Sequence, residues 1–523
     1  MKKLLTMLLL LSLSICSYAQ YDDAVKYAET ITQADLKDNL TILASDAMEG
    51  RETGERGQKM AAAFIAFHFE KLGLKPVVKE GTAYSYFQKI NLEKSWPGET
   101  YVTVNGKKLM NGEELAYWGR KNMTRETSIE VVFLGDGNEN VFHEVDVKGK
   151  AVVILASGSG FRQWRALSGK AQDEGALLTL LAVADDEASF NALKPQLKRF
   201  GGPSLGFKQE SSEAGGVFMI SQPIVSEIFG VTAAQLKKAA DSETAGKKGS
   251  LKKIKNGNIT YLITRKSETV TTENVLGLLE GTDKKEEILV VSSHYDHIGR
   301  IKSEANQIPS GQPYVDEINN GADDDGSGTT SVMEIAQAFA EAKKAGKGPR
   351  RSILFLCVTG EEKGLLGSQY YVEHPVFPLK NTVADLNIDM IGRFDPEHRD
   401  NREFVYLIGS NRLSTELHEL SEKANDTFTG LSLDYTYNDE KHPERIYYRS
   451  DHWNFAKNGI PIIFYFSGVH ADYHKPSDTV DKIEFDLLQK RARLVYYTAW
   501  ILANKNDRVV VDKLQETTIT ERN

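Results

Sequence analysis

Histidine and acidic side chains gather directly behind short apolar runs in the second half of the chain. The residues of this kind that follow such runs are His294, Asp296, His297, Glu361, Glu362, Asp389, His470, Asp472 and His474. Imidazole nitrogens and carboxylate oxygens without a thiolate suit zinc or a comparable divalent ion. The residue types therefore predict a metal site and the hydrolytic chemistry that such a site supports.

A second feature is a cluster of acids between glycines, in the segment 320–328. Asp323, Asp324 and Asp325 are consecutive, and like charges this close repel each other unless a cation neutralises them. Acids at a helix N-terminus and Asp-Gly turn chemistry offer a simpler interpretation of the same residues. Beside the other clusters, the metal interpretation is favoured.

Neighbouring residues in these clusters should have different roles. Glu361 and Glu362 are adjacent, so one should bind metal while the other acts as general base toward a water. In His294-x-Asp296 the alternation of a strand places both side chains on one side. Asp296 should therefore accept the second ring N–H of His294 and fix its tautomer.

The surrounding elements predict how these residues meet. From Glu273 onward, apolar strand-like runs alternate with helical patterns, which is typical of a mainly parallel sheet flanked by helices, the α/β class. Ligands bind at the carboxyl edge of such a sheet. The predicted strands are 288–292, 353–359, 383–388, 404–408 and 462–466, and the predicted helices are 329–342 and 485–504.

The rest of the chain divides by composition. Residues 20–94 predict helices, and residues 95–263 predict a β-rich inserted domain that carries few clustered His or acidic residues. The catalytic part should continue over 264–505, and 506–523 form a polar tail.

Residues 1–19 have the pattern of a secretory signal, with Lys2 and Lys3 before an apolar run and small residues ending at Ala19. This predicts export to the periplasm or the extracellular space. The run is too short for a transmembrane span. With Cys16 removed only Cys357 remains, so no internal disulfide can form. The formal charge of −9 gives no electrostatic reason to bind nucleic acid, and nothing specifies the oligomeric state.

The ordered motifs resemble those of peptidase family M28, the co-catalytic zinc aminopeptidases. These motifs are His294-Tyr295-Asp296, the acidic segment 321–328, Gly360-Glu361-Glu362, the segment 387–392 and Tyr473-His474. The segment Met48-Glu49-Gly50-Arg51 resembles the N-terminal helices of the same family. Residues 147–176 resemble part of a protease-associated (PA) domain, which would make the insert a β-rich PA domain.

The resemblance implies a zinc-dependent exopeptidase fold (phosphorylase/hydrolase-like) with two Zn²⁺ ions. Asp324 would bridge them, with His294 and Asp389 completing one site and Glu362 and His474 the other. It also implies a cis peptide between Asp324 and Asp325. Further expected roles are a general base for a metal-bridging water and a side chain that helps hold the oxyanion, filled by Glu361 and Tyr473. Asp296 and Asp325 would lie behind the ligands, and three further histidines would be structural or pocket-lining: His297, His452 and His470.

The function implied is hydrolysis of N-terminal peptide bonds in peptides with a free N-terminus. Other reactions occur on the same scaffold, because fold does not fix function. Acidic-dipeptide carboxypeptidases and single-zinc glutaminyl cyclases stay open as alternatives. A non-catalytic binding module is a third alternative, although no ligand and no base is missing from the motifs.

Overall fold

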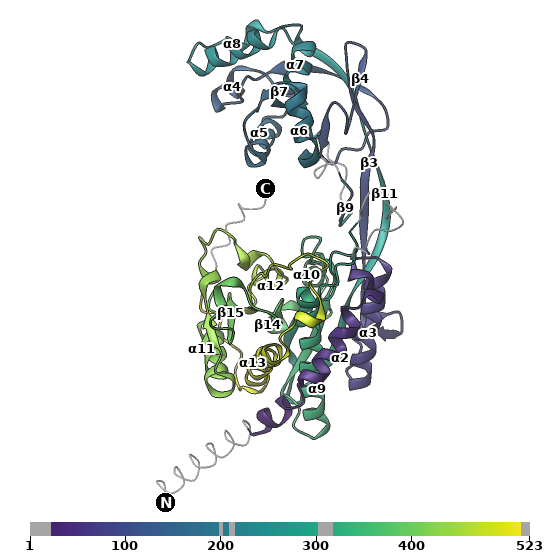
Figure 1. Ribbon diagram of the computed structural model, residues 1–523, viewed down its shortest axis with the longest axis vertical. Helices are drawn as coiled ribbons and strands as arrows, with labels where there is room; N and C mark the ends of the chain where they lie inside the picture. Colours follow the sequence, from purple (N-terminus) through teal and green to yellow (C-terminus); the bar gives the residue numbers. More distant parts are fainter. Residues whose placement is uncertain (1–21, 198–201, 209–214, 302–316, 514–523) are drawn as a thin grey trace, which may run out of the picture. The chain divides into compact units, whose positions relative to one another are not determined.

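The computed structural model describes residues 22–197, 202–208, 215–301 and 317–513 (Figure 1). The chain divides into two compact units. The first combines the chain through Asn91 with the chain from Thr271, and the second is Leu92–Val270. Two long strands, β3 (Phe87–Val104) and β11 (Gly257–Leu279), have residues in both units. The predicted signal sequence and residues 514–523 of the predicted tail lie outside the described residues.

The first unit is built on a mixed, mostly parallel sheet in the order β16-β15-β17-β14-β12-β13-β11. Its strands other than β11 are β12 (Lys284–His294), β13 (Arg351–Val358), β14 (Thr382–Ile388), β15 (Phe404–Ile408), β16 (Ser432–Asp434) and β17 (Ile462–Phe466). Only the β15–β17 and β11–β13 pairs of this sheet are antiparallel. This α/β sheet confirms the predicted fold class.

Helices cover both faces of this sheet (Figure 1). Alternate strand residues separate the two cores: Leu289 and Val291 belong to one, while Ile288 and Val290 belong to the other. The first core includes residues of α2 (Gln33–Leu43), α3 (Arg56–Leu72), α9 (Gly328–Lys344), α11 (Thr415–Ala424) and α13 (Phe485–Asn504). The second includes residues of α10 (Leu366–Glu373) and α12 (His452–Ala456). The result is a three-layer domain.

The second unit contains a parallel arrangement of β6 (Thr127–Phe133), β7 (Ala151–Leu155), β8 (Leu178–Ala184) and β10 (Val217–Ser221), with β5 (Ala116–Trp118) antiparallel to β10. β4 (Lys107–Met110) and β9 (Ser204–Gly206) pair with β3. Its helices are α4 (Glu139–Glu144), α5 (Phe161–Asp173), α6 (Glu187–Leu197), α7 (Gln222–Phe229) and α8 (Ala233–Thr244). The expectation of a β-rich insert was therefore incomplete.

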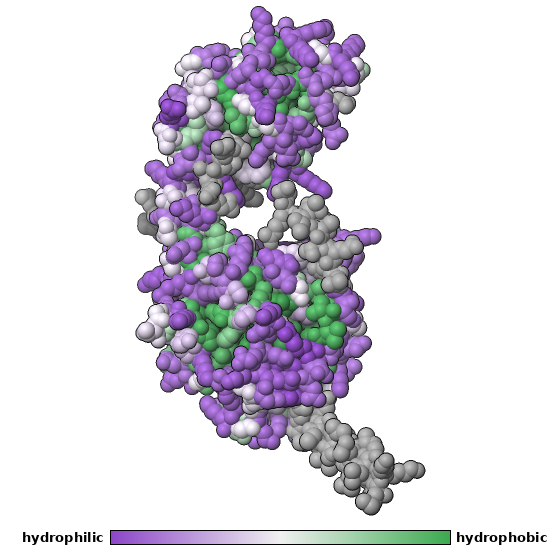
Figure 2. Space-filling model, turned by 180° about the vertical axis from the view of Figure 1, so that it is seen from behind, coloured by the Kyte–Doolittle hydropathy of each residue, from purple (hydrophilic) through white to green (hydrophobic). Residues whose placement is uncertain are grey.

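The sequence did not indicate α5 and α8 of the second unit because their apolar stripes are narrow. α5 buries only Trp164, Ser168 and Ala171, so its sequence reads as mostly polar. Charged and polar side chains also cover most of the molecular face in Figure 2. In the described part of the chain, no helix has the length and apolarity needed to cross a bilayer.

Candidate metal centre and active site

The ends of four strands and the start of one helix carry the site. β12 ends at His294, Asp389 follows β14, and Glu361 and Glu362 lie in the turn after β13. His474 lies in the loop after β17. Asp324 lies in the irregular helical turn Ala322–Ser327 that leads into α9. Segments far apart in the sequence thus converge at the carboxyl edge of the sheet, as the sequence predicted.

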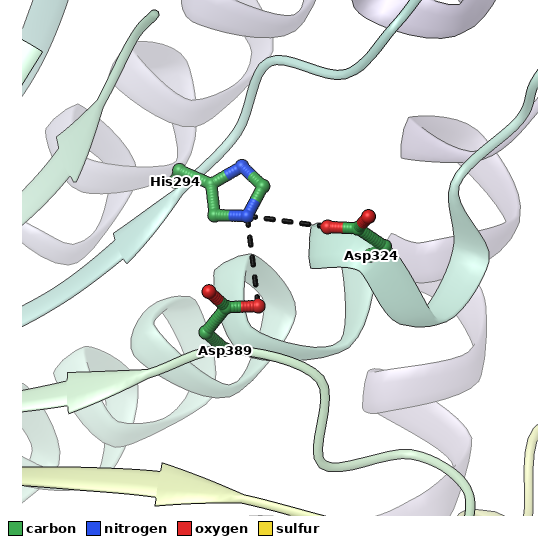
Figure 3. Close-up of side chains that lie close together, drawn as sticks. All are labelled: His294, Asp324 and Asp389. Atoms are coloured by element: carbon green, nitrogen blue, oxygen red, sulfur yellow. Dashed lines mark ion pairs between the residues drawn. The ribbon is translucent and has the colours of Figure 1, made fainter. Parts of the chain in front are cut away.

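The five predicted ligands form two adjoining groups that share Asp324. His294 Nε2 lies 3.3 Å from Asp324 Oδ1 and 3.6 Å from Asp389 Oδ1 (Figure 3). On the other side, His474 Nε2 lies 3.0 Å from Asp324 Oδ2 and 3.2 Å from Glu362 Oε2. Asp324 therefore presents one carboxylate oxygen to each group, the arrangement that a bridging ligand requires.

The donor set fits divalent metal ions. Asp324 Oδ2 and Glu362 Oε1 are buried, yet neither has a hydrogen-bond partner among the described residues. A buried carboxylate oxygen without a partner is costly in the absence of a cation. Imidazole nitrogens approach both oxygens without hydrogen-bond geometry, as expected for ligand atoms that face a shared cation. Zinc accepts this mixture of nitrogen and oxygen ligands.

His297, which was expected to be structural or pocket-lining, also belongs to this cluster. Its Nδ1 lies 2.8 Å from Glu362 Oε1 and 3.7 Å from Asp324 Oδ2, and its ring contacts that of His474 edge to face. Together with Asp324 and Glu362 it forms a group whose ligand atoms could hold an ion. Its position three residues after His294 was the available signal.

Asp296 does not hold His294 in the expected way. Nδ1 of His294 lies 3.1 Å from the main-chain carbonyl oxygen of Asp296 but 3.9 Å from its carboxylate. The predicted carboxylate hydrogen bond was wrong because β12 ends at His294, so strand alternation does not extend to Asp296. The carboxylate instead accepts hydrogen bonds from the Thr53 hydroxyl at 2.6 Å and the Glu361 amide at 3.2 Å. It thus positions the backbone of Glu361.

Glu361 lines a small cavity together with His294, Asp324 and Asp389. Burial is the main cause that raises the pKa of Glu361 well above its ordinary value, and the carboxylate of Asp389 adds to it, against the opposing effect of His294. A glutamate with a raised pKa beside a metal-ligand cluster is suited to accept and return a proton.

Tyr473 lies over the same site and is partly buried. Its ring stacks on that of His474 with 3.9 Å between the ring centroids. Burial, together with the nearby carboxylates of Asp324 and Glu362, raises the pKa of the phenol. Its hydroxyl therefore stays protonated and can donate a hydrogen bond.

Arg51 organises the backbone of the site from the N-terminal part of the chain. The side chain is 1% exposed. Its guanidinium donates to the carbonyl oxygens of Leu43, Tyr295, Asn320 and Gly321 at 2.6 to 2.9 Å, with a longer contact of 3.5 Å to that of Asp324. One cation therefore fixes both the end of β12 and the loop that carries the shared ligand.

The loop around Asp324 is held from further directions. Asp478 accepts hydrogen bonds from the amides of Asp323 and Asp324 at 3.0 and 3.2 Å. Gly321 has a φ of +56°, and a Cβ there would lie 2.2 Å from the carbonyl oxygen of Asp324. The peptide between Asp324 and Asp325 is cis, which confirms the prediction.

The remaining acids and histidines lie behind the ligands or away from them. Asp325 Oδ1 accepts from the amides of Gly328 and Met390 at 2.9 and 3.0 Å, behind the ligand cluster. His470 Nε2 lies 3.2 Å from Asp323 Oδ2. His452 Nε2 contacts the Tyr447 carbonyl oxygen at 2.7 Å and is buried away from the ligand cluster, in agreement with a structural role.

Part of the lining of the small cavity beside Glu361 is apolar. Its apolar lining consists of Met390, Ile446, Phe464, Phe466 and Val469. The first four are buried, and Val469 is 36% exposed. An aliphatic side chain of a ligand would be desolvated here, directly beside the metal ligands.

Comparisons with known proteins agree with this geometry. Residues 274–499 match the model of peptidase family M28. A probable leucine aminopeptidase of Arthroderma otae is 33% identical over 230 residues, which cover 43% of this chain and 56% of that protein. A probable zinc metalloprotease of Pyrenophora tritici-repentis is 27% identical over 274 residues, 45% of this chain and 52% of that protein. The chain therefore spans about half the length of these curated relatives.

A solved structure extends the comparison beyond the matched segment. The aminopeptidase from Aneurinibacillus sp. strain AM-1 aligns with a TM-score of 0.53, covering 94% of this chain and 98% of that one. The two sequences are 18% identical in this alignment. The similarity shows a shared fold.

Proposed function

We propose that the protein is a member of peptidase family M28, whose model residues 274–499 match, and that it acts as a zinc-dependent aminopeptidase. The observation that carries the proposal is the pair of ligand groups that share Asp324, with Glu361 beside them. Relatives named as a leucine aminopeptidase and a zinc metalloprotease support the choice of activity and metal.

Two zinc ions would be held by His294 and Asp389 on one side of Asp324 and by Glu362 and His474 on the other. His297 adds an imidazole to the second group. The chemistry that such ions would supply here is a water molecule of lowered pKa and polarisation of the scissile carbonyl.

The protein's own residues supply the proton transfers. Glu361 takes the proton of the attacking water and later gives it to the leaving amine. The amide hydrogen bond from Glu361 to Asp296 fixes the backbone from which this side chain extends. The phenol of Tyr473 donates a hydrogen bond to the carbonyl oxygen as negative charge develops there.

The apolar cavity suggests which N-terminal residue is removed. Met390, Ile446 and Phe466 would bury an aliphatic side chain next to the scissile bond. Each methylene transferred from water contributes roughly 0.8 kcal/mol. Leucine should therefore be cleaved faster than alanine, and charged N-terminal residues should be poor substrates.

The N-terminal pattern of Lys2, Lys3 and an apolar run supports a further proposal, that the protein is exported before it acts. It would then meet peptides in the periplasm or outside the cell.

Hydrolysis of leucyl p-nitroanilide, with and without N-acetylation, tests the proposed activity. An aminopeptidase should cleave the free amine and ignore the acetylated form. Equal cleavage of both would refute the proposal, as would release of C-terminal residues from acetylated peptides, which is carboxypeptidase activity. Cyclisation of N-terminal glutamine without hydrolysis would favour the cyclase alternative.

A further inference from the structure

A second, larger cavity adjoins the apolar one. The two share Glu361, Arg449 and Tyr473. The other residues that line the larger cavity are Glu362, Gly364, Leu365, Gln369, Tyr448, Trp453 and Asn454. Glu361 and Tyr473 thus line both cavities, so a peptide bond cleaved beside them would have its N-terminal residue in the apolar cavity. The following residue then lies in the larger one.

We propose that Arg449 binds the free C-terminal carboxylate of a dipeptide substrate in this larger cavity, so that dipeptides are the preferred substrate class. The proposal rests on the proposed aminopeptidase function and adds a specificity-determining residue to it.

The charge balance of the cavity supports this role. Glu361 and Glu362 repel a substrate carboxylate, and Arg449 is the one cation among the described lining residues. Within the described chain, the Arg449 guanidinium makes no hydrogen bond and no ion pair. A guanidinium presents paired donors that match both oxygens of a carboxylate.

Other polar groups of the lining are already engaged. The Asn454 side-chain amide donates to the Leu365 carbonyl oxygen at 3.1 Å and to the Ser368 hydroxyl at 2.7 Å. The Gln369 amide donates to Glu373 at 2.9 Å. Among the amide and guanidinium side chains of the described lining, the Arg449 side chain is therefore the donor left for a ligand.

The position of Arg449 is fixed relative to the metal ligands. The next residue, Ser450, donates its hydroxyl to Asp389 Oδ2 at 2.7 Å and accepts from the Asn387 amide at 2.9 Å. The Asp451 carboxylate then accepts from Ser368 at 2.5 Å. The backbone that bears the cation is thus tied to the ligand Asp389 through Ser450.

Aromatic rings complete this subsite. Tyr448 and Trp453 meet edge to face with 4.8 Å between centroids, and both line the cavity. They can pack against the second side chain without selecting its charge. A longer peptide has a neutral amide where a dipeptide has its carboxylate, so Arg449 would favour the dipeptide.

The test compares kcat/KM for leucyl-alanine, leucyl-alanine amide and N-acetyl-leucyl-alanine, all with the zinc-loaded full chain. We expect the free acid to exceed its amide by about tenfold, the size of one charge-assisted hydrogen bond at an exposed site. Arg449→Met should bring the acid-to-amide ratio close to one, and Arg449→Lys should give an intermediate ratio. Lys363→Met is the matched control, because it removes a nearby cation that pairs with Glu52, lines neither cavity and should leave the ratio unchanged.

A ratio near one in the unmodified protein overturns the proposal, and so does an unchanged ratio in Arg449→Met. Failure of the underlying function has a different signature. If the protein is not an aminopeptidase, either leucyl p-nitroanilide and both free-amine substrates stay intact, or N-acetyl-leucyl-alanine is cleaved as well.

Discussion

The guanidinium of Arg51 donates a hydrogen bond of 2.9 Å to the main-chain carbonyl of Gly321, the residue at which the loop around Asp324 begins. The same side chain donates to the carbonyl of Tyr295, next to His294. A residue from the N-terminal part of the chain therefore sets the spacing between two predicted metal ligands. Because these contacts are to main-chain atoms, they constrain the backbone.

Arg51→Lys should weaken zinc binding, since an ammonium keeps the charge but cannot reach carbonyls spread around a planar guanidinium. We expect a loss of about 10- to 100-fold in affinity, typical of groups that orient ligands from behind. Competition with a chromophoric chelator measures it.

Arg351→Lys is the matched control for that experiment. Arg351 is equally buried and donates to the carbonyls of Leu502, Lys505 and Asn506, remote from the ligand cluster. It should lower the free energy of unfolding and leave zinc affinity unchanged. Equal zinc affinity of Arg51→Lys and the unmodified protein would refute the positioning role.

The variants Glu361→Gln and Glu362→Gln should distinguish the general base from the metal ligand. Glu361→Gln should retain zinc and lose about 10²- to 10⁴-fold in kcat, because the amide cannot accept the proton. Glu362→Gln should lose zinc itself, since its oxygens lie against His474 and His297. Elemental analysis beside turnover distinguishes them, and near-normal turnover of Glu361→Gln would remove it from the mechanism.

The sequence indicated the catalytic domain well because its elements carry continuous apolar patterns. The predicted bounds 404–408, 462–466 and 485–504 coincide with β15, β17 and α13. In contrast, the long strand β11 was not predicted. The polar stretch that includes Arg265 and Glu268 interrupts its apolar pattern, and strand pairing rather than local sequence stabilises it.

In the candidate site too, the sequence predicted some of the residues and not others. The five predicted ligands converge because each follows a buried strand or precedes a helix, which periodicity reveals. Arg51 and Asp478 hold main-chain atoms, and a main-chain carbonyl or amide leaves no trace in the residue types around it. The direction of the Asp296 carboxylate could not be predicted from the sequence either, because it depends on the residue at which β12 ends.

Val469→Trp should narrow the apolar cavity, since Val469 lines it and is partly exposed, so the larger ring can be accommodated without disturbing the core. Cleavage of leucyl p-nitroanilide should fall by roughly tenfold relative to the alanyl substrate, within the range for a methylene-scale change in an apolar pocket. The ratio of the two kcat/KM values is the measurement. An unchanged ratio would place the N-terminal side chain elsewhere.

Glu334 should make the protein less stable as pH rises. Burial is the main cause that raises its pKa from 4.5 to about 8, and Asp35 adds to it. Between these values the unfolded chain is ionised while the folded protein keeps the proton. The contribution of protonated Glu334 to the free energy of unfolding is therefore fully present below pH 4.5. It is lost as the pH rises to about 8.

In Glu334→Gln this pH dependence should disappear. Relative to the variant, the unmodified protein should lose about 2–4 kcal/mol in free energy of unfolding between pH 5 and 8. Urea unfolding at both pH values measures it. Glu341→Gln, at a partly exposed position on α9 that pairs with Lys344, should behave like the unmodified protein. Parallel pH profiles for Glu334→Gln and the unmodified protein would contradict the assignment.

The most direct test of the central claim is a zinc titration of the metal-stripped full chain, followed by hydrolysis of leucyl p-nitroanilide. We predict no turnover without metal, and recovery that is complete when two zinc ions are bound per chain, because Asp324 presents one oxygen to each ligand group. Undiminished turnover of the metal-stripped protein would contradict a metal-dependent aminopeptidase, and full recovery at one zinc ion would contradict the two-ion centre.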